Sequence, residues 1–497
     1  MSSHDSAYAE LTARLRHHQV LESVGEHLGW DEQVNLPEGA ARQRGEQMAA
    51  LAAAAHDLAA APRLGELIAL LDGAGGLDGD ERTVVLQARR DFERATKLPA
   101  EFVREKAELS SRGYHVWAQA RAASDFSAYA PTIQAHLDLA RREAAYLGRT
   151  AAPYDCFLDQ HDPGMTAAVV EPLFAELEAG LVPLGRVLAA APPPARRGPS
   201  PATEARQREF CREVTTRMGF DYRRGRLDTS LHPFCSGTGD DVRLTMRFLA
   251  TDPLSALFAA IHEAGHGLYE QGLPAAARGT ALGRHAGMAV HESQSRLWEN
   301  FVGRSLGFWR YFAPRLGAVG AAAATPEDIY RTVNQVRPTL IRVEADDVTY
   351  NLHIILRFQL EQRLFAGTLA VADLPAAWKA RSRELLGLEP PSDREGVLQD
   401  VHWSGGAFGY FPSYCLGNMI AAQLWEQLLG LRPALEEDFA RGDFAWLLAW
   451  LRTHVHAAAR RHDPLTLVRR LTGRELSPQP LLRYLNNKYK KLYGLGA

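Results

Sequence analysis

Two histidines four residues apart, His262 and His266, lie in the segment Ile-His-Glu-Ala-Gly-His. Because side chains at this spacing share a helix face, both imidazoles could hold one metal ion. Glu263 follows the first histidine, where its carboxylate could take a proton from a metal-bound water. The segment therefore predicts a hydrolytic metal site. A helix whose histidines only pack or face water is the alternative, and the motif alone leaves it open.

A third protein ligand is expected downstream, because a catalytic zinc site has three protein ligands and leaves its fourth position to water. Glu292 opens a further helical pattern, at a distance along the chain that suits two helices packed side by side. Gly272, Pro274 and Gly283 fall in the stretch between them and predict a loop. A His-His-Glu set of this kind is typical of thermolysin-like peptidase sites.

A glycine- and aromatic-rich stretch further along the chain contains His402 and Tyr414. Such stretches often form loops that line a cleft. Both side chains could donate hydrogen bonds to the oxyanion that develops during peptide hydrolysis. Taken singly, each is more often an ordinary packed side chain.

One arginine and three carboxylates stand among apolar residues in the segment Ile-Arg-Val-Glu-Ala-Asp-Asp. Its arginine, Arg342, is a candidate for binding a free substrate carboxylate, because a guanidinium matches a carboxylate in a two-bond fork. A structural ion pair with Glu344 or Asp346 is the alternative that the local sequence favours.

Helix-length apolar patterns dominate the chain and must position these residues. They are expected over residues 8–30, 47–61, 101–111, 128–147 and 171–190, and again after Pro253. Residues 191–201 carry five prolines and a glycine, so neither a helix nor a central strand continues through them. This predicted linker separates an N-terminal helical portion, 1–190, from the portion that carries the metal site, 202–497.

Alternating apolar residues between Arg226 and Phe248 follow a turn-rich stretch and predict one short β-hairpin. The expected fold class is therefore mainly α, with one small hairpin or sheet.

The composition argues against several classes of protein. The 497-residue chain has a formal net charge of -3, without the basic excess that nucleic-acid binding requires. It shows neither a signal-peptide pattern nor a run of about 18 apolar residues, so the cytoplasm is expected and a membrane is not. The four cysteines form no C-x-x-C pair, which argues against a disulfide framework or a thiolate metal site.

Six motifs, taken in chain order, resemble those of the carboxypeptidase Taq family of metallocarboxypeptidases. They are His232-Pro233-Phe234, Asp241-Val-Arg243-Leu-Thr245, His262-Glu263-Ala-Gly-His266, His291-Glu292-Ser293-Gln294, Ile341-Arg342-Val-Glu-Ala345-Asp346 with Thr349-Tyr350, and Gly396-Val-Leu-Gln399-Asp400-Val-His402-Trp403. The likeness also includes Gly29-Trp30-Asp31 and Tyr484-Leu-Asn-Asn-Lys488-Tyr489, and so covers essentially the whole chain. The stretch Gln33-Val34-Asn35-Leu36 departs from the family, which more often has a Thr and a Met before the proline.

The resemblance implies a single, almost entirely helical domain over residues 1–497, with a deep central cleft. The fold of the family is similar to that of neurolysin and angiotensin-converting enzyme, and its members usually form homodimers. His262, His266 and Glu292 match the metal ligands of the family, and Glu263 matches the general base.

The same resemblance suggests substrate contacts. Arg342 falls in the motif associated with the terminal carboxylate of the substrate. His232, His402 and Tyr414 match cleft motifs, so His232 is expected to contact substrate and the other two to contact the transition state. The motif of Asp241 and Arg243 fits a structural role at the cleft wall at least as well.

The expected activity is release of single C-terminal amino acids, with broad specificity, from peptides with a free C-terminus. Zinc is the expected metal, with cobalt or manganese as substitutes. Without a cation one residue beyond the metal, the same site would serve a metallo-endopeptidase. A carboxylate-binding cation placed one residue further from the metal would give a dipeptidyl carboxypeptidase. A helical scaffold with a structural metal is a further alternative, although Glu263 would then have no purpose.

Overall fold

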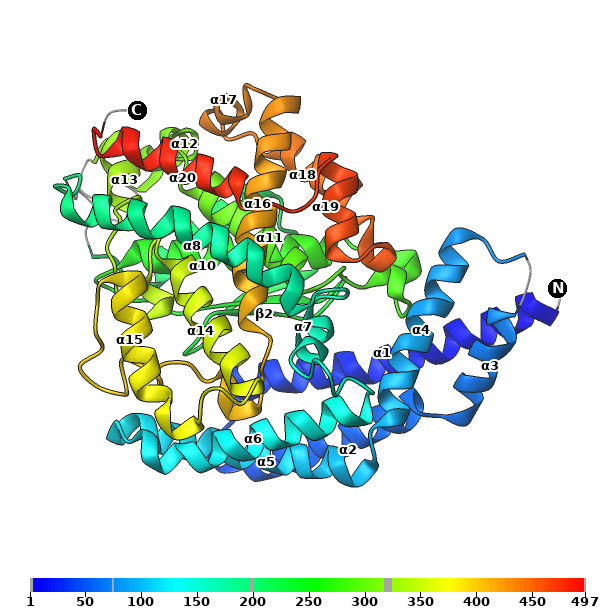
Figure 1. Ribbon diagram of the computed structural model, residues 1–497. Helices are drawn as coiled ribbons and strands as arrows, with labels where there is room; N and C mark the ends of the chain where they lie inside the picture. Colours follow the sequence, from blue (N-terminus) through cyan, green and yellow to red (C-terminus); the bar gives the residue numbers. More distant parts are fainter. Residues whose placement is uncertain (1–2, 74–75, 196–200, 317–323, 496–497) are drawn as a thin grey trace. The chain divides into compact units, whose positions relative to one another are not determined.

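The computed structural model describes residues 3–73, 76–195, 201–316 and 324–495. Within these ranges helices make up nearly all of the regular structure, and the strands belong to one small sheet (Figure 1). The chain forms two compact units, each assembled from three separate stretches of sequence. Unit 1 comprises Met1–Thr96, Arg197–Tyr330 and Leu428–Leu471, and unit 2 comprises Lys97–Arg196, Arg331–Gln427 and Thr472–Ala497.

Unit 1 holds the sheet and the helices that carry the predicted metal ligands. The helices that lie wholly or mainly in it are α1 (Ser3–Val34), α2 (Ala41–Ala59), α3 (Pro62–Asp72), α4 (Gly79–Lys97), α9 (Glu204–Met218), α10 (Pro253–Gly272), α11 (Met288–Arg296), α12 (Leu306–Leu316), α13 (Pro326–Val333), α17 (Leu435–Ala440), α18 (Ala445–Leu451) and α19 (Pro464–Thr472). A π-helical segment, η4 (Leu297–Gly303), continues α11.

The sheet has three strands in the order β1-β3-β2. β2 (Phe234–Ser236) and β3 (Val242–Met246) are antiparallel, and β1 (Gly225–Thr229) lies parallel to β3 on its other side. The predicted hairpin is therefore present as β2 and β3, and β1 is an addition to it. Val242, Leu244 and Met246 of β3 are fully buried, and α10 packs against this strand.

Unit 2 is helical in its described part. The helices that lie wholly or mainly in it are α5 (Ala100–Ala123), α6 (Phe126–Tyr146), α7 (Asp155–His161), α8 (Ala167–Ala190), α14 (Tyr350–Phe365), α15 (Leu374–Leu386), α16 (Phe411–Leu431) and α20 (Gln479–Leu492). Two short 3₁₀ turns, η6 (Arg342–Glu344) and η8 (His402–Gly405), carry candidate site residues.

The mainly helical fold class is confirmed, together with its small sheet. Of the predicted linker, residues 196–200 lie outside the described residues; α8 ends before the linker at Ala190 and α9 begins after it at Glu204. That residues 1–497 form a single domain with a deep cleft stays a prediction. No helix in the described part of the chain is long and apolar enough to cross a membrane.

Candidate metal centre

Helix α10 carries both candidate histidines, and local sequence explains where it starts. The side chain of Asp252 accepts a hydrogen bond from the backbone N–H of Ser255, and Pro253 occupies the first turn. Both features are typical of helix N-termini. The helix then runs without a break past His262 and His266, which places their side chains one turn apart on one face.

Gly265 allows α11 to approach this part of α10 closely. A Cβ atom at Gly265 would lie 2.5 Å from Cα of Ser295 and 2.9 Å from the carbonyl oxygen of Gln294. No larger residue fits there without moving one of the two helices. The predicted loop between the helices is also found, since α10 ends at Gly272 and α11 begins at Met288.

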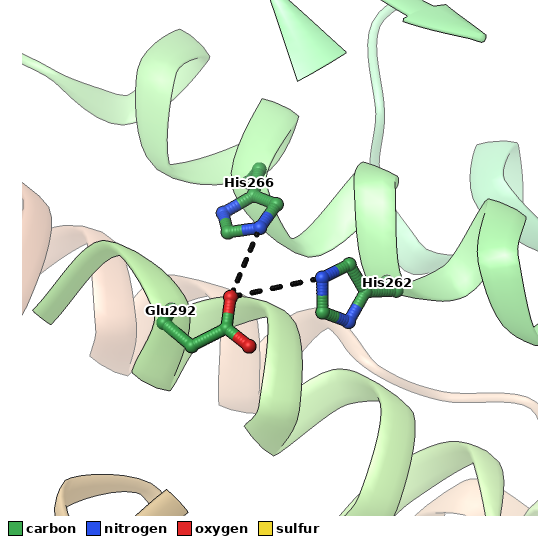
Figure 2. A group of neighbouring side chains, drawn as sticks. All are labelled: His262, His266 and Glu292. Carbon is green, nitrogen blue, oxygen red and sulfur yellow. Dashed lines mark ion pairs between the residues drawn. The ribbon is translucent and has the colours of Figure 1, made fainter. Parts of the chain in front are cut away.

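The two histidines of α10 and Glu292 of α11 converge (Figure 2). One carboxylate oxygen of Glu292, Oε2, lies 3.7 Å from Nε2 of His262 and 3.4 Å from Nε2 of His266. The three ligand atoms lie within 4.8 Å of one another. Among the described residues, this is the only group of three or more such side chains with metal-ligand spacing. The predicted ligand set is therefore brought together within one unit.

The remaining ring nitrogen of His262 is held by a carboxylate. Nδ1 of His262 lies 2.8 Å from Oε2 of Glu299, which is in the π-helical segment η4. Arg296 joins the two acidic residues, because its Nε donates to Oε1 of Glu292 at 2.6 Å and its Nη1 donates to Glu299 at 3.2 Å. Glu292 therefore keeps Oε2 directed at the histidines. Carboxylates behind a histidine ligand fix its tautomer and orientation.

His266 is held by a second chain of side chains. Its Nδ1 lies 2.6 Å from Nδ1 of His291, and Nε2 of His291 lies 2.9 Å from Oε1 of Glu270. Glu270 is on α10, one turn after His266. In both histidine ligands, Nδ1 is thus engaged and Nε2 remains for a metal.

The protonation states also suit a divalent cation. Burial lowers the pKa of His266 to about 3, which keeps the ring neutral, as a metal ligand must be. Burial works against ionisation of Glu292, but Arg296 and both histidines hold its pKa well below the usual range. Burial also opposes a charge on His262, and the charge of Glu292 with the hydrogen bond to Glu299 outweighs it, so that its pKa is raised. A cation at Nε2 would take the place of that proton.

Glu263 is buried, with 8 % of its surface exposed. Burial, followed by the charge of Glu292, raises its pKa to about 7, although His262 opposes the shift. A carboxyl group with such a pKa can both accept and release a proton near neutral pH. The charge of Glu263 also acts on Cys235 of β2. Burial raises the pKa of this thiol, and the charges of Glu263, Glu270 and Glu26 add to the shift.

Arg342 belongs to unit 2 and is buried, with 7 % exposed. Its partner is Asp400, which accepts from Nε at 3.0 Å and pairs with Nη2 at 2.9 Å. The ion pair is thus made neither with Glu344 nor with Asp346. Asp400 also accepts two hydrogen bonds from the fully buried Arg357, at 2.7 and 2.5 Å.

His402 and Tyr414 lie together in the same unit. Nε2 of His402 is 3.0 Å from the hydroxyl of Tyr414, and the guanidinium carbon of Arg342 lies 5.1 Å from the centre of the Tyr414 ring. Three of the predicted site residues therefore form one cluster in unit 2, while His262, Glu263, His266 and Glu292 form another in unit 1.

His232 belongs to unit 1, where its exposed side chain lies just before β2. Its carbonyl oxygen accepts a hydrogen bond from the hydroxyl of Ser230. Nearby, Arg243 pairs with Asp241 at 2.9 Å and stacks over Trp30 at 4.1 Å. This arrangement agrees with a structural role for the Asp241–Arg243 pair.

The sequence reasoning missed the supporting carboxylates Glu299 and Glu270 and assigned no role to Asp400. A signal for Glu299 was present, because it follows Glu292 by about two helical turns and so shares its face. Asp400 belongs to the family-like motif that runs from Gly396 to Trp403. Its pairing with two arginines distant in sequence left no local pattern.

Known proteins resemble the chain over nearly its full length. Residues 10–489 match the family described as carboxypeptidase Taq (M32) metallopeptidase. The chain is 41% identical to thermostable carboxypeptidase 1 of Thermus thermophilus and 35% identical to carboxypeptidase 1 of Bacillus subtilis, and each alignment covers 99% of both chains. The crystal structure of the M32 carboxypeptidase from Deinococcus radiodurans R1 superposes with a TM-score of 0.94 at 42% identity, covering 98% of this chain and 100% of that one.

Proposed function

The chain belongs to the carboxypeptidase Taq (M32) family and is a metallocarboxypeptidase, and we propose that it releases single amino acids, with broad specificity, from peptides with a free C-terminus. The convergence of His262, His266 and Glu292 beside the buried Glu263 is the observation that supports this proposal most directly.

His262, His266 and Glu292 would hold the cation, for which we propose zinc, with cobalt or manganese as substitutes. Two histidines and one glutamate are a donor set typical of catalytic zinc sites. When bound, the cation supplies a Lewis acid that polarises the scissile carbonyl and acidifies water. Glu299, Arg296 and the His291–Glu270 pair keep the three ligands oriented.

Glu263 is the proposed general base. It takes a proton from the attacking water and then delivers that proton to the leaving amine. Burial of Glu263 opposes its ionisation, and this favours a carboxyl group that takes up a proton and then releases it. His402 and Tyr414 are proposed to donate to the oxyanion, and His232 is proposed to contact the substrate.

Arg342 is the proposed binding group for the terminal carboxylate of the substrate. Two arginines, Arg342 and Arg357, share the single carboxylate of Asp400. The cluster of these three side chains therefore keeps one excess positive charge in a buried setting. A buried guanidinium that is already oriented by an ion pair binds a carboxylate at a small entropic cost. Capture of the free carboxylate would restrict cleavage to the last peptide bond.

Product analysis by mass spectrometry tests the proposal. A peptide with a blocked N-terminus is offered with a free or an amidated C-terminus to the metal-loaded wild type, Glu263→Gln and Arg342→Met. Stepwise loss of single residues from the free peptide is expected, and Glu263→Gln should abolish it. Arg342→Met should lower kcat/KM for the free peptide about 100-fold, the scale of a lost charged contact. Arg337→Met, at an exposed position, is the matched control.

The other outcomes of this assay separate the alternatives. Cleavage of internal bonds in both peptides would retain the metal site and refute the carboxypeptidase assignment in favour of an endopeptidase. Release of dipeptides would indicate a dipeptidyl carboxypeptidase. A metal-loaded protein without any cleavage would favour a scaffold with a structural metal.

We also propose that the protein acts in the cytoplasm and that, as the family resemblance implies, it forms a homodimer. Sedimentation-velocity analysis of the metal-loaded protein tests the dimer. A single species of about 55 kDa at micromolar concentration would refute it.

A further inference from the structure

Glu361 of α14 is a buried carboxylate in unit 2 that the proposed chemistry does not use. Its exposed surface is 0 %. Burial raises its pKa to about 7, although the hydrogen bonds that it accepts oppose the shift. A buried carboxylate is costly unless its oxygens are hydrogen-bonded. The groups that donate to Glu361 therefore show what it holds in place.

Both oxygens of this carboxylate accept hydrogen bonds. The indole N–H of Trp403 donates to Oε1 at 2.6 Å. The backbone N–H of Gly409 donates to Oε2 at 2.9 Å, and the hydroxyl of Tyr154 donates to the same oxygen at 2.8 Å. An indole and a backbone amide can only donate, and here each of them takes a different oxygen. A side chain that binds both must present two acceptors, which a carboxylate does and an amide does not.

Two of these donors belong to residues 402–410, which comprise η8 and the turn that leads into α16. The amide of Gly409 is bonded to Glu361 and not to a helix or strand. Gly409 has a φ of 71°, and a Cβ atom there would lie 2.7 Å from the carbonyl carbon of Phe157 in α7. The backbone at this point therefore lies directly against α7. Glu361 fixes the path of the turn where regular structure does not.

The same stretch of chain carries His402 and leads to Tyr414 in α16. Trp403 follows His402 directly, is only 4 % exposed, and packs edge-on against Phe411 with ring centres 6.2 Å apart. The ring of His402 also packs against Phe411, at 4.4 Å. Nε2 of His402 then meets the hydroxyl of Tyr414 at 3.0 Å. Buried aromatic contacts thus connect Glu361 to the His402–Tyr414 pair.

We propose that Glu361 is a positioning residue, which holds the His402–Tyr414 pair in the orientation that donation to the oxyanion requires. It acts through Trp403 and Gly409 and not by touching the substrate. The inference rests on the proposed function of His402 and Tyr414. Donors of this kind stabilise the transition state only when their geometry is fixed before the charge develops. A displacement of about 1 Å can lower the rate about 100-fold.

A merely structural role for Glu361 would have a different kinetic signature. Arg342 is held by Asp400 and by the side chain of Gln399, which accepts from the backbone N–H of Arg342 at 2.9 Å. These bonds do not involve Glu361, so the binding of the terminal carboxylate should persist when Glu361 is changed. A positioning role therefore predicts a lower kcat at nearly constant KM, whereas general loosening of unit 2 would raise KM as well.

Steady-state kinetics of the metal-loaded protein, on a peptide with a blocked N-terminus and a free C-terminus, test the proposal. Glu361→Gln keeps the shape of the side chain but turns an N–H toward either Trp403 or Gly409. We expect kcat to fall at least about 20-fold, with KM within about threefold of the wild type and an unchanged metal content. Glu143→Gln is the matched control, because it neutralises another buried glutamate of unit 2, which pairs with Lys106. Its kcat should stay within about twofold of the wild type.

Trp403→Phe tests the specific contact. It removes the donor to Oε1, so the new amide of Glu361→Gln no longer faces an indole N–H. The effect of Glu361→Gln on kcat should therefore be at least about threefold smaller in the Trp403→Phe background. If Glu361→Gln does not fold, Trp403→Phe alone decides the matter: we expect its kcat to fall at least about fivefold at constant KM, and a wild-type kcat would overturn the proposal.

Two reference variants separate this inference from the proposed function. His402→Gln and Tyr414→Phe should each lower kcat, because each removes a proposed donor to the oxyanion. If both retain the kcat of the wild type, the proposed function of the pair fails and the inference fails with it. If both lower kcat while Glu361→Gln retains it, only the positioning role is refuted. The same conclusion follows if Glu143→Gln loses as much activity as Glu361→Gln, or if the effects of Glu361→Gln and Trp403→Phe are additive.

Discussion

Replacing Glu299 by glutamine should weaken metal binding although this residue is not a predicted ligand. The substitution keeps the size of the side chain and an oxygen that can accept from His262, so the shape of the site is retained. It removes the charge that lies 2.8 Å from Nδ1 of His262. Loss of such a supporting carboxylate typically lowers metal affinity 10- to 100-fold, which corresponds to about 1.4–2.7 kcal/mol.

The structure places the expected loss in the upper half of that range. Arg296 divides its guanidinium between Glu292, at 2.6 Å, and Glu299, at 3.2 Å. When Glu299 becomes neutral, the attraction of Arg296 for Glu292 is no longer shared. The carboxylate of Glu292 then becomes a weaker donor, so one substitution affects two of the three ligands. We therefore expect about a 50-fold increase in the dissociation constant.

Competition with a chromophoric zinc chelator measures this constant for the wild type, Glu299→Gln and the surface control Glu32→Gln. Circular dichroism of the metal-free proteins establishes that the variants are folded. A zinc affinity of folded Glu299→Gln within twofold of that of the wild type would refute the reasoning, because the carboxylate behind His262 would then contribute nothing to metal binding. An equal loss in the control would assign the effect to net charge alone.

Three further predictions concern other parts of the structure. Asp400→Asn leaves two buried arginines without their shared carboxylate and should lower the free energy of unfolding by about 3–5 kcal/mol in urea; a loss below about 1 kcal/mol would contradict the buried ion pairs. Gly265→Ala should separate α10 from α11 and reduce the metal bound per chain, measured by elemental analysis. A Cβ atom at Gly29 would meet no atom within 4 Å, so Gly29→Ala is the control and should keep its metal. Burial lowers the pKa of His136 to about 4 in the folded protein. As the pH drops from about 6.5 to 4, this histidine therefore takes up a proton in the unfolded chain but not in the folded one. The free energy of unfolding should fall over this range by up to about 3 kcal/mol. His136→Gln should make that decline shallower, and an unchanged slope would exclude the histidine as its source.

The parts of the site that could be predicted from sequence are those set by local geometry. The spacing of His262 and His266 fixes their common face as soon as a helix forms, and this pair needed no tertiary information. Glu292 required only a second helix after a loop. The sheet was predicted in part, because β2 and β3 are neighbours in sequence, whereas the parallel pairing of β1 depends on contacts that alternation does not encode.

The partner of Arg342 shows why the rest could not be predicted. Glu344 and Asp346 are close in sequence, and a local interpretation favours them. The 3₁₀ turn at Arg342 and the hydrogen bonds that Asp346 accepts from Arg337, Val348 and Thr349 leave Asp400 as the partner. Long-range ion pairs depend on which buried surfaces meet, and that is decided by the packing of whole helices.

The interleaving of the two units has a consequence for synthesis on the ribosome. Unit 1 is complete only when Leu471 has emerged, although its first stretch ends at Thr96. At ordinary translation rates, roughly half a minute passes between the synthesis of the first stretch and that of Leu471. It has its own apolar cluster, in which Leu11 of α1 packs with Leu64, Leu67 and Leu71 of α3. The nascent chain can therefore bury these leucines early, before α10 and α11, which carry the metal ligands, emerge with the second stretch of the unit.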